Sequence, residues 1–183
     1  KLSHRRREAG CREVLLVGHS LGGVVARVAL ARQRGPGVTR VVQLGAPNHG
    51  SYAPVLALRG LYPTVRKLAA LDRRHSAEDL ARLIFRTLPA LHELLPDPAL
   101  IGDVDLFDAA RWPDDALRPQ PALLTAARTE RTHWPGPDPR CLHIVGVRQD
   151  TVIGVESAGA EFDFSVAPLG DGTVPLRLAV QPG

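Results

Sequence analysis

The glycine-rich run Gly18–Gly23 constrains this chain more than any other part of it. It follows the apolar stretch Val14–Val17, which is typical of a strand buried on both faces. The segment 21–34 comes next and has the apolar spacing of a helix. A strand that turns directly into a helix through Gly-x-Ser-x-Gly has the pattern of a nucleophile elbow. The sequence therefore predicts an exposed serine, Ser20, at this turn.

Each position of the predicted elbow has a physical role. Gly18 and Gly22 are expected to leave room for a sharp, strained turn. The turn lifts Ser20 above the sheet at a helix N-terminus, where free amides favour a nearby anion. The backbone N–H of Leu21 is then the expected oxyanion donor.

Further strands place the elbow in a parallel α/β sheet. Val38–Leu44 is predicted as a second buried strand and 142–147 as a third, while 152–155 and 162–166 are predicted to form a hairpin. The predicted organisation is an α/β-hydrolase core over residues 1–51, a helical cap over 52–140, and the resumed core over 141–183. With its one short helix before the elbow, the core is expected to be incomplete at both ends.

The proline-rich segment 52–140 is expected to hold short helices. Ser76 and Asp79 have the spacing of a capping box. An apolar stripe follows, made of Leu80, Leu83, Ile84 and Leu88. Two interpretations remain open for it: core packing, or contact with an apolar substrate.

A serine nucleophile needs a base and an acid that orients the base. In this fold the acid follows a late strand, and two residues qualify. Asp150 comes after the predicted strand 142–147, and Asp171 stands in a Gly-Asp-Gly loop. Spacing favours Asp171 over Asp150 without excluding either.

Three motifs together resemble the lecithin:cholesterol acyltransferase family of lipases: 14–23, 45–51 and 170–175. The segments 91–96 and 105–113 resemble the cap of its bacterial members. The resemblance implies an α/β-hydrolase with a cap, with Ser20 as nucleophile and Asp171 as triad acid. It also implies acyl transfer from an ester, which is a lipid in the usual chemistry of the family, to water or to an alcohol.

The triad histidine of that family follows the acid loop, and no histidine follows Asp171 in this sequence. We therefore expect the base to lie outside these 183 residues. The second oxyanion donor, which in this fold precedes the elbow strand, is likewise expected to lie outside them. Asn48 and His49 are expected to line the substrate pocket. The alternative is a truncated or degenerate domain that binds without catalysing.

Composition excludes other classes of function. The net charge of +4 comes from basic residues spread along the chain, with 4% aromatics, so no nucleic-acid partner is predicted. No metal-binding or phosphate-loop motif occurs, and no cofactor is expected. The expected partners are an ester or lipid substrate and transiently, through the cap, a lipid surface, without an obligate protein partner. In the α/β-hydrolase order, Val38–Leu44 is expected to lie between the elbow strand and the strand 142–147. Cys11 and Cys141 are therefore expected to be near each other but unbonded, because strands two spacings apart lie about 10 Å apart, beyond the ~7 Å disulfide limit.

Overall fold

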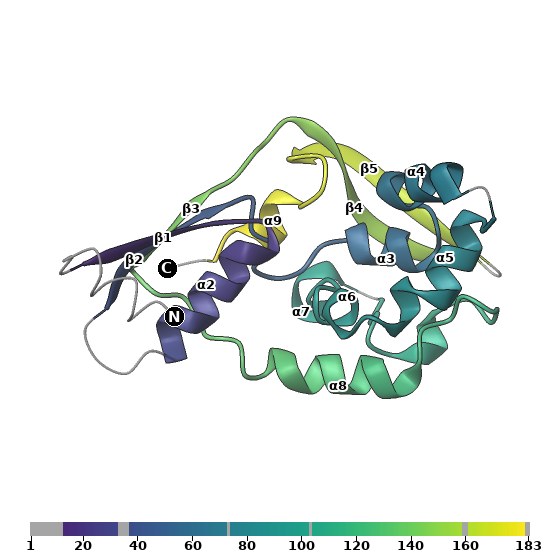
Figure 1. Ribbon diagram of the computed structural model, residues 1–183, viewed down its shortest axis with the longest axis horizontal. Helices are drawn as coiled ribbons and strands as arrows, with labels where there is room; N and C mark the ends of the chain where they lie inside the picture. The colour runs from purple at the N-terminus through teal and green to yellow at the C-terminus, as the bar shows by residue number, and fades with distance from the viewer. Residues whose placement is uncertain (1–12, 33–36, 73, 103, 159–160, 182–183) are drawn as a thin grey trace.

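Three parallel strands form the first sheet of the computed structural model, which describes residues 13–32, 37–72, 74–102, 104–158 and 161–181 (Figure 1). They are β1 (Val14–His19), β2 (Val38–Leu44) and β3 (Cys141–Ile144), in the order β1–β2–β3. The predicted order, with β2 in the middle, is confirmed. Because the strands are parallel, their carboxyl ends meet at one edge of the sheet.

Helix α2 (Leu21–Arg32) covers one face of this sheet (Figure 1). Its Ala26 and Leu30 pack on Val38 and Val41. On the opposite face Leu15, Val17, Leu142 and Ile144 are 51–62% exposed. The prediction that the first and third strands are buried on both faces is therefore wrong, since no other described element covers that side.

Helices occupy the chain between β2 and β3. They are α3 (Ala53–Leu58), α4 (Pro63–Asp72), α5 (Ala77–Leu83), η1 (Phe85–Thr87), α6 (Pro89–Glu93), α7 (Pro98–Ile101), η2 (Ala109–Arg111) and α8 (Pro121–Arg131). Prolines stand in the first turn of α3, α6, α7 and α8. The backbone N–H that proline lacks would have no acceptor within the helix at this position, so no hydrogen bond is lost. The frequent prolines of this segment thus begin its helices.

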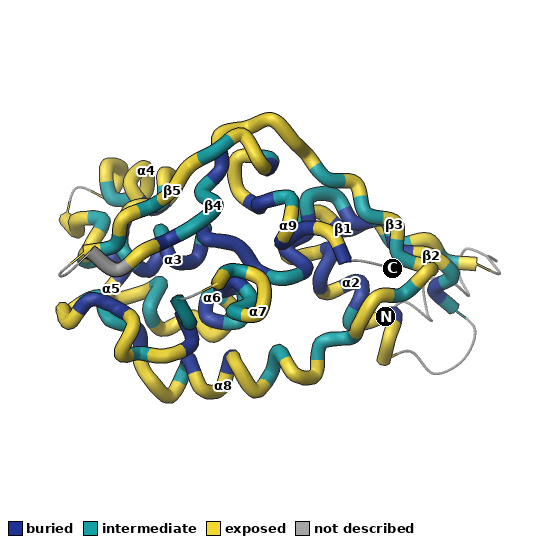
Figure 2. The backbone as a smooth tube through the Cα atoms, turned by 180° about the vertical axis from the view of Figure 1, so that it is seen from behind, coloured by how far each residue is buried: buried dark blue, intermediate teal, exposed yellow. Residues whose placement is uncertain are grey.

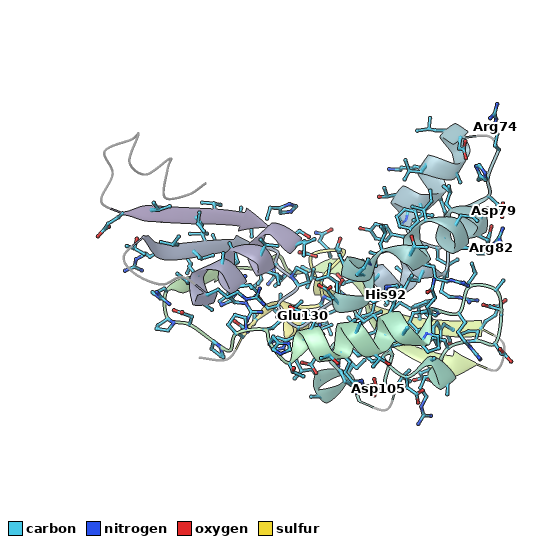
Figure 3. All side chains as sticks on the ribbon, turned by 60° about the horizontal axis from the view of Figure 1, so that its bottom comes forward. Arg74, Asp79, Arg82, His92, Asp105 and Glu130 are labelled. Carbon is cyan, nitrogen blue, oxygen red and sulfur yellow. The ribbon has the colours of Figure 1, made fainter. Side chains whose placement is uncertain are left out.

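The predicted capping box is present at the start of α5. The Asp79 N–H donates to Ser76 Oγ at 3.0 Å, and the Ser76 N–H donates to Asp79 Oδ2 at 3.1 Å. Asp79 also pairs with Arg82 one turn later, and both stand at the edge of the helical segment (Figure 3). Two backbone donors that the helix leaves free are satisfied in this way.

The apolar stripe that follows the capping box is only partly buried. Leu80 is 8% exposed, whereas Leu83, Ile84 and Leu88 are 50%, 49% and 41% exposed. Helix α5 ends at Leu83, and Ile84 and Leu88 are the residues directly before and after the short helix η1. Core packing therefore holds for Leu80 and is wrong for the other three.

The hairpin forms a second, antiparallel sheet of β4 (Gln149–Ala158) and β5 (Glu161–Gly170), longer at both ends than predicted. It lies against the helical segment, away from the parallel sheet, and α9 (Leu176–Ala179) follows it (Figures 1 and 2). Trp112 and Phe162 meet edge to face, with ring centroids 5.3 Å apart. The largest buried cluster joins the helical segment to the hairpin and α9. Its residues include Tyr52, Leu58, Leu106, Trp112, Leu124, Val155, Val174 and Leu178.

Two further observations concern the chain as a whole. Within the described ranges, every helix is too short or too polar to cross a bilayer. Cys141 has a free thiol, and its predicted relation to Cys11 falls outside the described residues, as does the charged helix expected over residues 1–10.

Candidate active site

Ser20 stands at the turn between β1 and α2 with a φ of +52°. Arg148 is the other non-glycine residue with positive φ in the part of the chain that the structure describes. The turn is fixed on both sides: the Ser20 N–H donates to Leu44 O at 2.9 Å, and the Gly23 N–H donates to Ser20 O at 2.9 Å. A left-handed backbone costs an L-residue roughly 1–2 kcal/mol, so this geometry is a strained elbow.

Two glycines make this turn possible. A Cβ on Gly18 would lie 2.5 Å from Gly22 O, and a Cβ on Gly23 would lie 2.7 Å from Ala46 Cβ. Gly22 has no atom within 4 Å of such a Cβ. The clearance therefore comes from Gly18 and Gly23, and the prediction that Gly22 provides it is wrong.

Leu21 is the first residue of α2, so its N–H has no acceptor within the helix. It directly follows Ser20 at the positive end of the helix dipole. This amide has the position that the sequence predicts for an oxyanion donor.

Asp171 lies at the carboxyl ends of β2 and β3. A Cβ on Gly45 would be 2.9 Å from Asp171 Oδ2, and one on Gly146 would be 2.7 Å from Asp171 Cβ. Asp171 Oδ1 accepts hydrogen bonds from the N–H groups of Thr173 (2.9 Å) and Val174 (2.8 Å). The carboxylate is therefore held in place by its own loop at the sheet edge from which the elbow rises.

Asp150, the other candidate acid, lies in β4 and is exposed. It has no contact of this kind with the ends of β2 and β3 among those that the described residues make. The geometry thus favours Asp171 as the acidic residue beside the elbow.

A pocket of about 230 Å³ opens beside Ser20. Thr173 and Val174 of the acid loop form part of its wall, so the pocket brings the elbow and the acid loop together. The remaining wall comes from the 47–54 segment and from the helices: Pro47, Ser51, Ala53, Pro54, Ala57, Tyr62, Thr64, Val65, Phe85, Leu91 and Leu94. This lining is mostly apolar.

No histidine of the described residues lines this pocket. His19 is exposed within the elbow, His75 pairs with Asp72, and His133 is exposed next to Glu130. His92 is fully buried, with Nδ1 2.9 Å from Leu88 O. The predicted location of the base outside this sequence remains a prediction.

Asn48 and His49 line a second pocket, not the one beside Ser20. Asn48 is nevertheless tied to the elbow: the Gln43 side chain donates to Asn48 Oδ1 (3.0 Å) and to Gly23 O (2.8 Å), and Asn48 Nδ2 donates to Ala179 O (2.8 Å). Sequence reasoning missed Gln43. Its signal was a polar residue two positions after Val41, on the same, buried face of the strand.

The second pocket measures about 460 Å³ and lies between α2, the 48–49 turn and α8. His49 Nδ1 is 3.6 Å from Asp97 Oδ2 there, and burial lowers the pKa of His49 while Asp97 opposes that shift. Arg27, which also lines this pocket, is 1% exposed. Sequence reasoning did not single out Arg27, because a helix register alone does not show that a guanidinium is buried.

Comparison with known proteins agrees with this architecture. Residues 3–84, which include the elbow, match the family model described as the PGAP1-like alpha/beta domain. The fold is of the α/β-hydrolase type. Asp171 lies beyond the matched range, and no curated protein matches the chain.

The PGAP1-like match supports a hydrolase-type domain, which is a coarser statement than the resemblance to lecithin:cholesterol acyltransferases. Over the described residues, no group of three or more histidine, cysteine, aspartate or glutamate side chains is arranged to hold a metal ion.

Proposed function

We propose that this protein is a serine-dependent esterase or acyltransferase that acts on lipid esters. The observation that carries the proposal is the left-handed backbone of Ser20 at the strand-to-helix turn, next to an apolar pocket whose wall includes the acid loop. Strain of this kind persists where the surrounding structure holds it, and it is concentrated at functional sites.

In the proposed reaction Ser20 Oγ attacks the ester carbonyl as a histidine takes its proton, and the Leu21 N–H donates to the developing oxyanion. The carbon–oxygen bond to the alcohol then breaks, and the histidine returns the proton to the leaving alkoxide. Water or a second alcohol attacks the acyl-serine by the same steps in reverse. Asp171 orients the histidine and stabilises its charged form.

The lining of the pocket favours an apolar acyl chain. Tyr62, Val65, Phe85 and Leu91 come from the helical segment and face the same space as Ser20. An aliphatic chain removed from water there gains about 0.8 kcal/mol for each buried CH₂. The resemblance to lecithin:cholesterol acyltransferases supports a lipid ester as substrate, and both hydrolysis and transfer fit this pocket.

We also propose that a lipid–water surface contacts the helical segment beside the pocket. Leu83 and Ile84 are half exposed and directly precede Phe85, which lines the pocket. Leu71, at the end of α4, is 80% exposed. Apolar side chains next to the pocket support direct entry of a lipid chain from such a surface.

The competing proposal is a domain that binds a lipid ester without catalysis. The absence of a histidine from the described lining of the Ser20 pocket favours it. The two proposals differ in whether Ser20 is activated.

A fluorophosphonate probe, followed by intact-mass and peptide analysis of the full-length protein, separates the two proposals. Catalysis predicts one covalent adduct on Ser20, which is lost in Ser20→Ala and strongly slowed in Asp171→Asn. Ser165→Ala is the matched control, because Ser165 is exposed on β5, outside this pocket, and should leave labelling unchanged. A folded protein that takes up no probe supports the binding domain, and an adduct that persists in Ser20→Ala overturns the assignment of the nucleophile.

A further inference from the structure

The second pocket collects buried polar atoms that have no hydrogen-bond partner. Within the described residues five such side-chain atoms occur, and three of them, Arg27 Nε, His49 Nε2 and Gln181 Oε1, belong to residues that line this pocket. Leaving a buried donor or acceptor unpaired costs about 1–3 kcal/mol. Their gathering around one cavity therefore points to a ligand that hydrogen-bonds there.

Charges around the pocket are unevenly compensated. Arg128 pairs with Asp105, and Arg131 is 3.5 Å from Asp97, the carboxylate that also lies near His49. Figure 3 labels Asp105, the partner of Arg128, and Glu130, which lies on α8 together with Arg128. Arg27 is the exception, because its ion pairs and hydrogen bonds in the described structure include no carboxylate.

Backbone carbonyls satisfy only part of the Arg27 guanidinium. One terminal nitrogen donates to Pro135 O, and the other is 3.4 Å from Asn48 O. These contacts join α2 to the 135–137 segment and account for a structural role. Among the described residues they leave the positive charge of this 1% exposed side chain without a carboxylate partner, which is costly unless an anion pairs with it.

We propose that this pocket binds a phosphate monoester, with the phosphate group held by the positive charges of Arg27, Arg128 and Arg131. Guanidinium groups that approach from separate elements suit a tetrahedral phosphate, whose oxygens accept from several directions. A carboxylate offers only two oxygens in one plane.

The size of the pocket favours an ester over inorganic phosphate. Its volume of about 460 Å³ falls in the range of sites for organic ligands, roughly 300–1,000 Å³. Phe107 and Trp134 line it and carry the Arg131 guanidinium over their rings at 5.8 and 4.8 Å. The organic part of the ligand therefore meets aromatic and proline surfaces next to the phosphate group.

This site is distinct from the pocket beside Ser20. Pro47 and Ser51 line the Ser20 pocket, whereas Asn48 and His49 line the second pocket. Asn48 and His49 stand between Pro47 and Ser51 in the sequence. The turn 47–51 thus separates the two cavities. The proposal concerns binding alone and does not depend on catalysis by Ser20.

Isothermal titration of the full chain at constant ionic strength tests the proposal with four compounds: glycerol 3-phosphate, a water-soluble short-chain phosphatidic acid, inorganic phosphate and hexanoate. We expect saturable one-to-one binding of a phosphate ester, weaker binding of inorganic phosphate, and none of hexanoate. A preference for glycerol 3-phosphate identifies a soluble ligand, and a preference for phosphatidic acid identifies a lipid headgroup. Hexanoate bound as tightly as the phosphate esters, or no saturable binding of any phosphate compound, overturns the proposal.

Variants locate the binding. Arg27→Lys keeps the charge but removes the fork of donors, and should weaken binding about tenfold. Arg128→Gln changes a half-exposed residue of the lining, folds without a buried change, and should weaken binding about threefold. Arg111→Gln is the matched control, because Arg111 also pairs with an aspartate but lies outside the pocket. If Arg27→Lys does not fold, Arg128→Gln decides: equal effects of Arg128→Gln and Arg111→Gln overturn the proposal.

Discussion

The carboxylate of Asp171 lies directly over Gly45, so that a Cβ on this glycine would stand 2.9 Å from Asp171 Oδ2. Gly146, at the end of the neighbouring strand, is equally close to the Asp171 side chain. The acid loop is thus seated on two strand ends that leave room for it only because both carry glycine. A contact between residues so far apart in the sequence gives the acid a fixed position relative to the elbow.

Gly146→Ala should disturb this seat. The new Cβ would lie 2.7 Å from Asp171 Cβ, so the acid loop has to shift. A displacement of about 1 Å in a catalytic group lowers rates by up to about 100-fold, and we expect the fluorophosphonate labelling rate of Ser20 to fall by about 10–100-fold. Gly136→Ala is the control, because a Cβ there meets nothing within 4 Å. Equal labelling rates in the two variants would contradict the assignment of Asp171.

Gly18 and Gly22 of the elbow should respond differently to substitution by alanine. Gly18→Ala places a Cβ 2.5 Å from a backbone oxygen of the turn and should destabilise the protein by about 1–3 kcal/mol. The Cβ that Gly22→Ala adds meets no atom within 4 Å, and alanine forms a helix more readily than glycine. This variant should therefore be neutral or stabilising by up to about 1 kcal/mol. Urea unfolding of both variants measures the difference, and destabilisation of the same size in both would contradict the elbow geometry.

Local patterns made the elbow, the order of the parallel strands and the capping box predictable. Each depends on residues close in sequence, such as Ser76 and Asp79, or on the general rules of parallel sheets. The exposed face of β1 was not predictable in this way, since Val17 has the same side chain whether or not an element packs on it. Burial depends on contacts between distant segments.

The site shows the same limit. Glycines stand two positions to each side of Ser20 and directly beside Asp171, so the sequence identified both residues as candidates. Whether Asn48 and His49 face the Ser20 pocket depends on how the 45–50 turn is fixed by Gln43 and by the carbonyl of Ala179. Arg27 has the same dependence, because its partners come from residues 48 and 135.

The strain at Ser20 can be measured directly. Ser20→Gly and Ser20→Ala both remove the hydroxyl, but only glycine adopts a φ of +52° without steric cost. We expect Ser20→Gly to be more stable than Ser20→Ala by about 1 kcal/mol in chemical unfolding. A paired change at Ser165, an exposed strand residue, should give the opposite order, because glycine weakens a strand. Equal stability of the two Ser20 variants would show that the elbow is not strained.

Buried histidines should make the protein less stable in acid. Burial lowers the pKa of His92, His49 and His143 below the value of about 6.5 that unfolded histidine has. Below that pH the unfolded chain binds more protons than the folded one, so stability is complete above about pH 6.5 and is lost as the pH falls. The fully buried His92 contributes at most about 1.4 kcal/mol per pH unit.

His92 is the most direct test of this dependence, because its side chain is fully buried. His92→Gln should flatten the fall in melting temperature between about pH 6.5 and 5. His133→Gln changes an exposed histidine and should leave that slope as it is in the unmodified protein. If both variants retain the original slope, protonation of His92 does not contribute to acid unfolding.

The proposed lipid contact predicts a loss of membrane binding in the double variant Leu83→Gln/Ile84→Gln. Both side chains are about half exposed, so replacing them removes little from the core and keeps the charge of the protein. Each residue inserted into a lipid surface contributes about 1 kcal/mol, and the partition coefficient onto phosphatidylcholine vesicles should fall about tenfold or more. Val25→Gln/Val166→Gln is the matched control, since these valines are 59% and 58% exposed but lie on α2 and β5, away from the Ser20 pocket. Co-sedimentation with vesicles measures all three proteins, and an equal loss in both double variants would show that general surface hydrophobicity, and not the face beside Phe85, contacts the lipid.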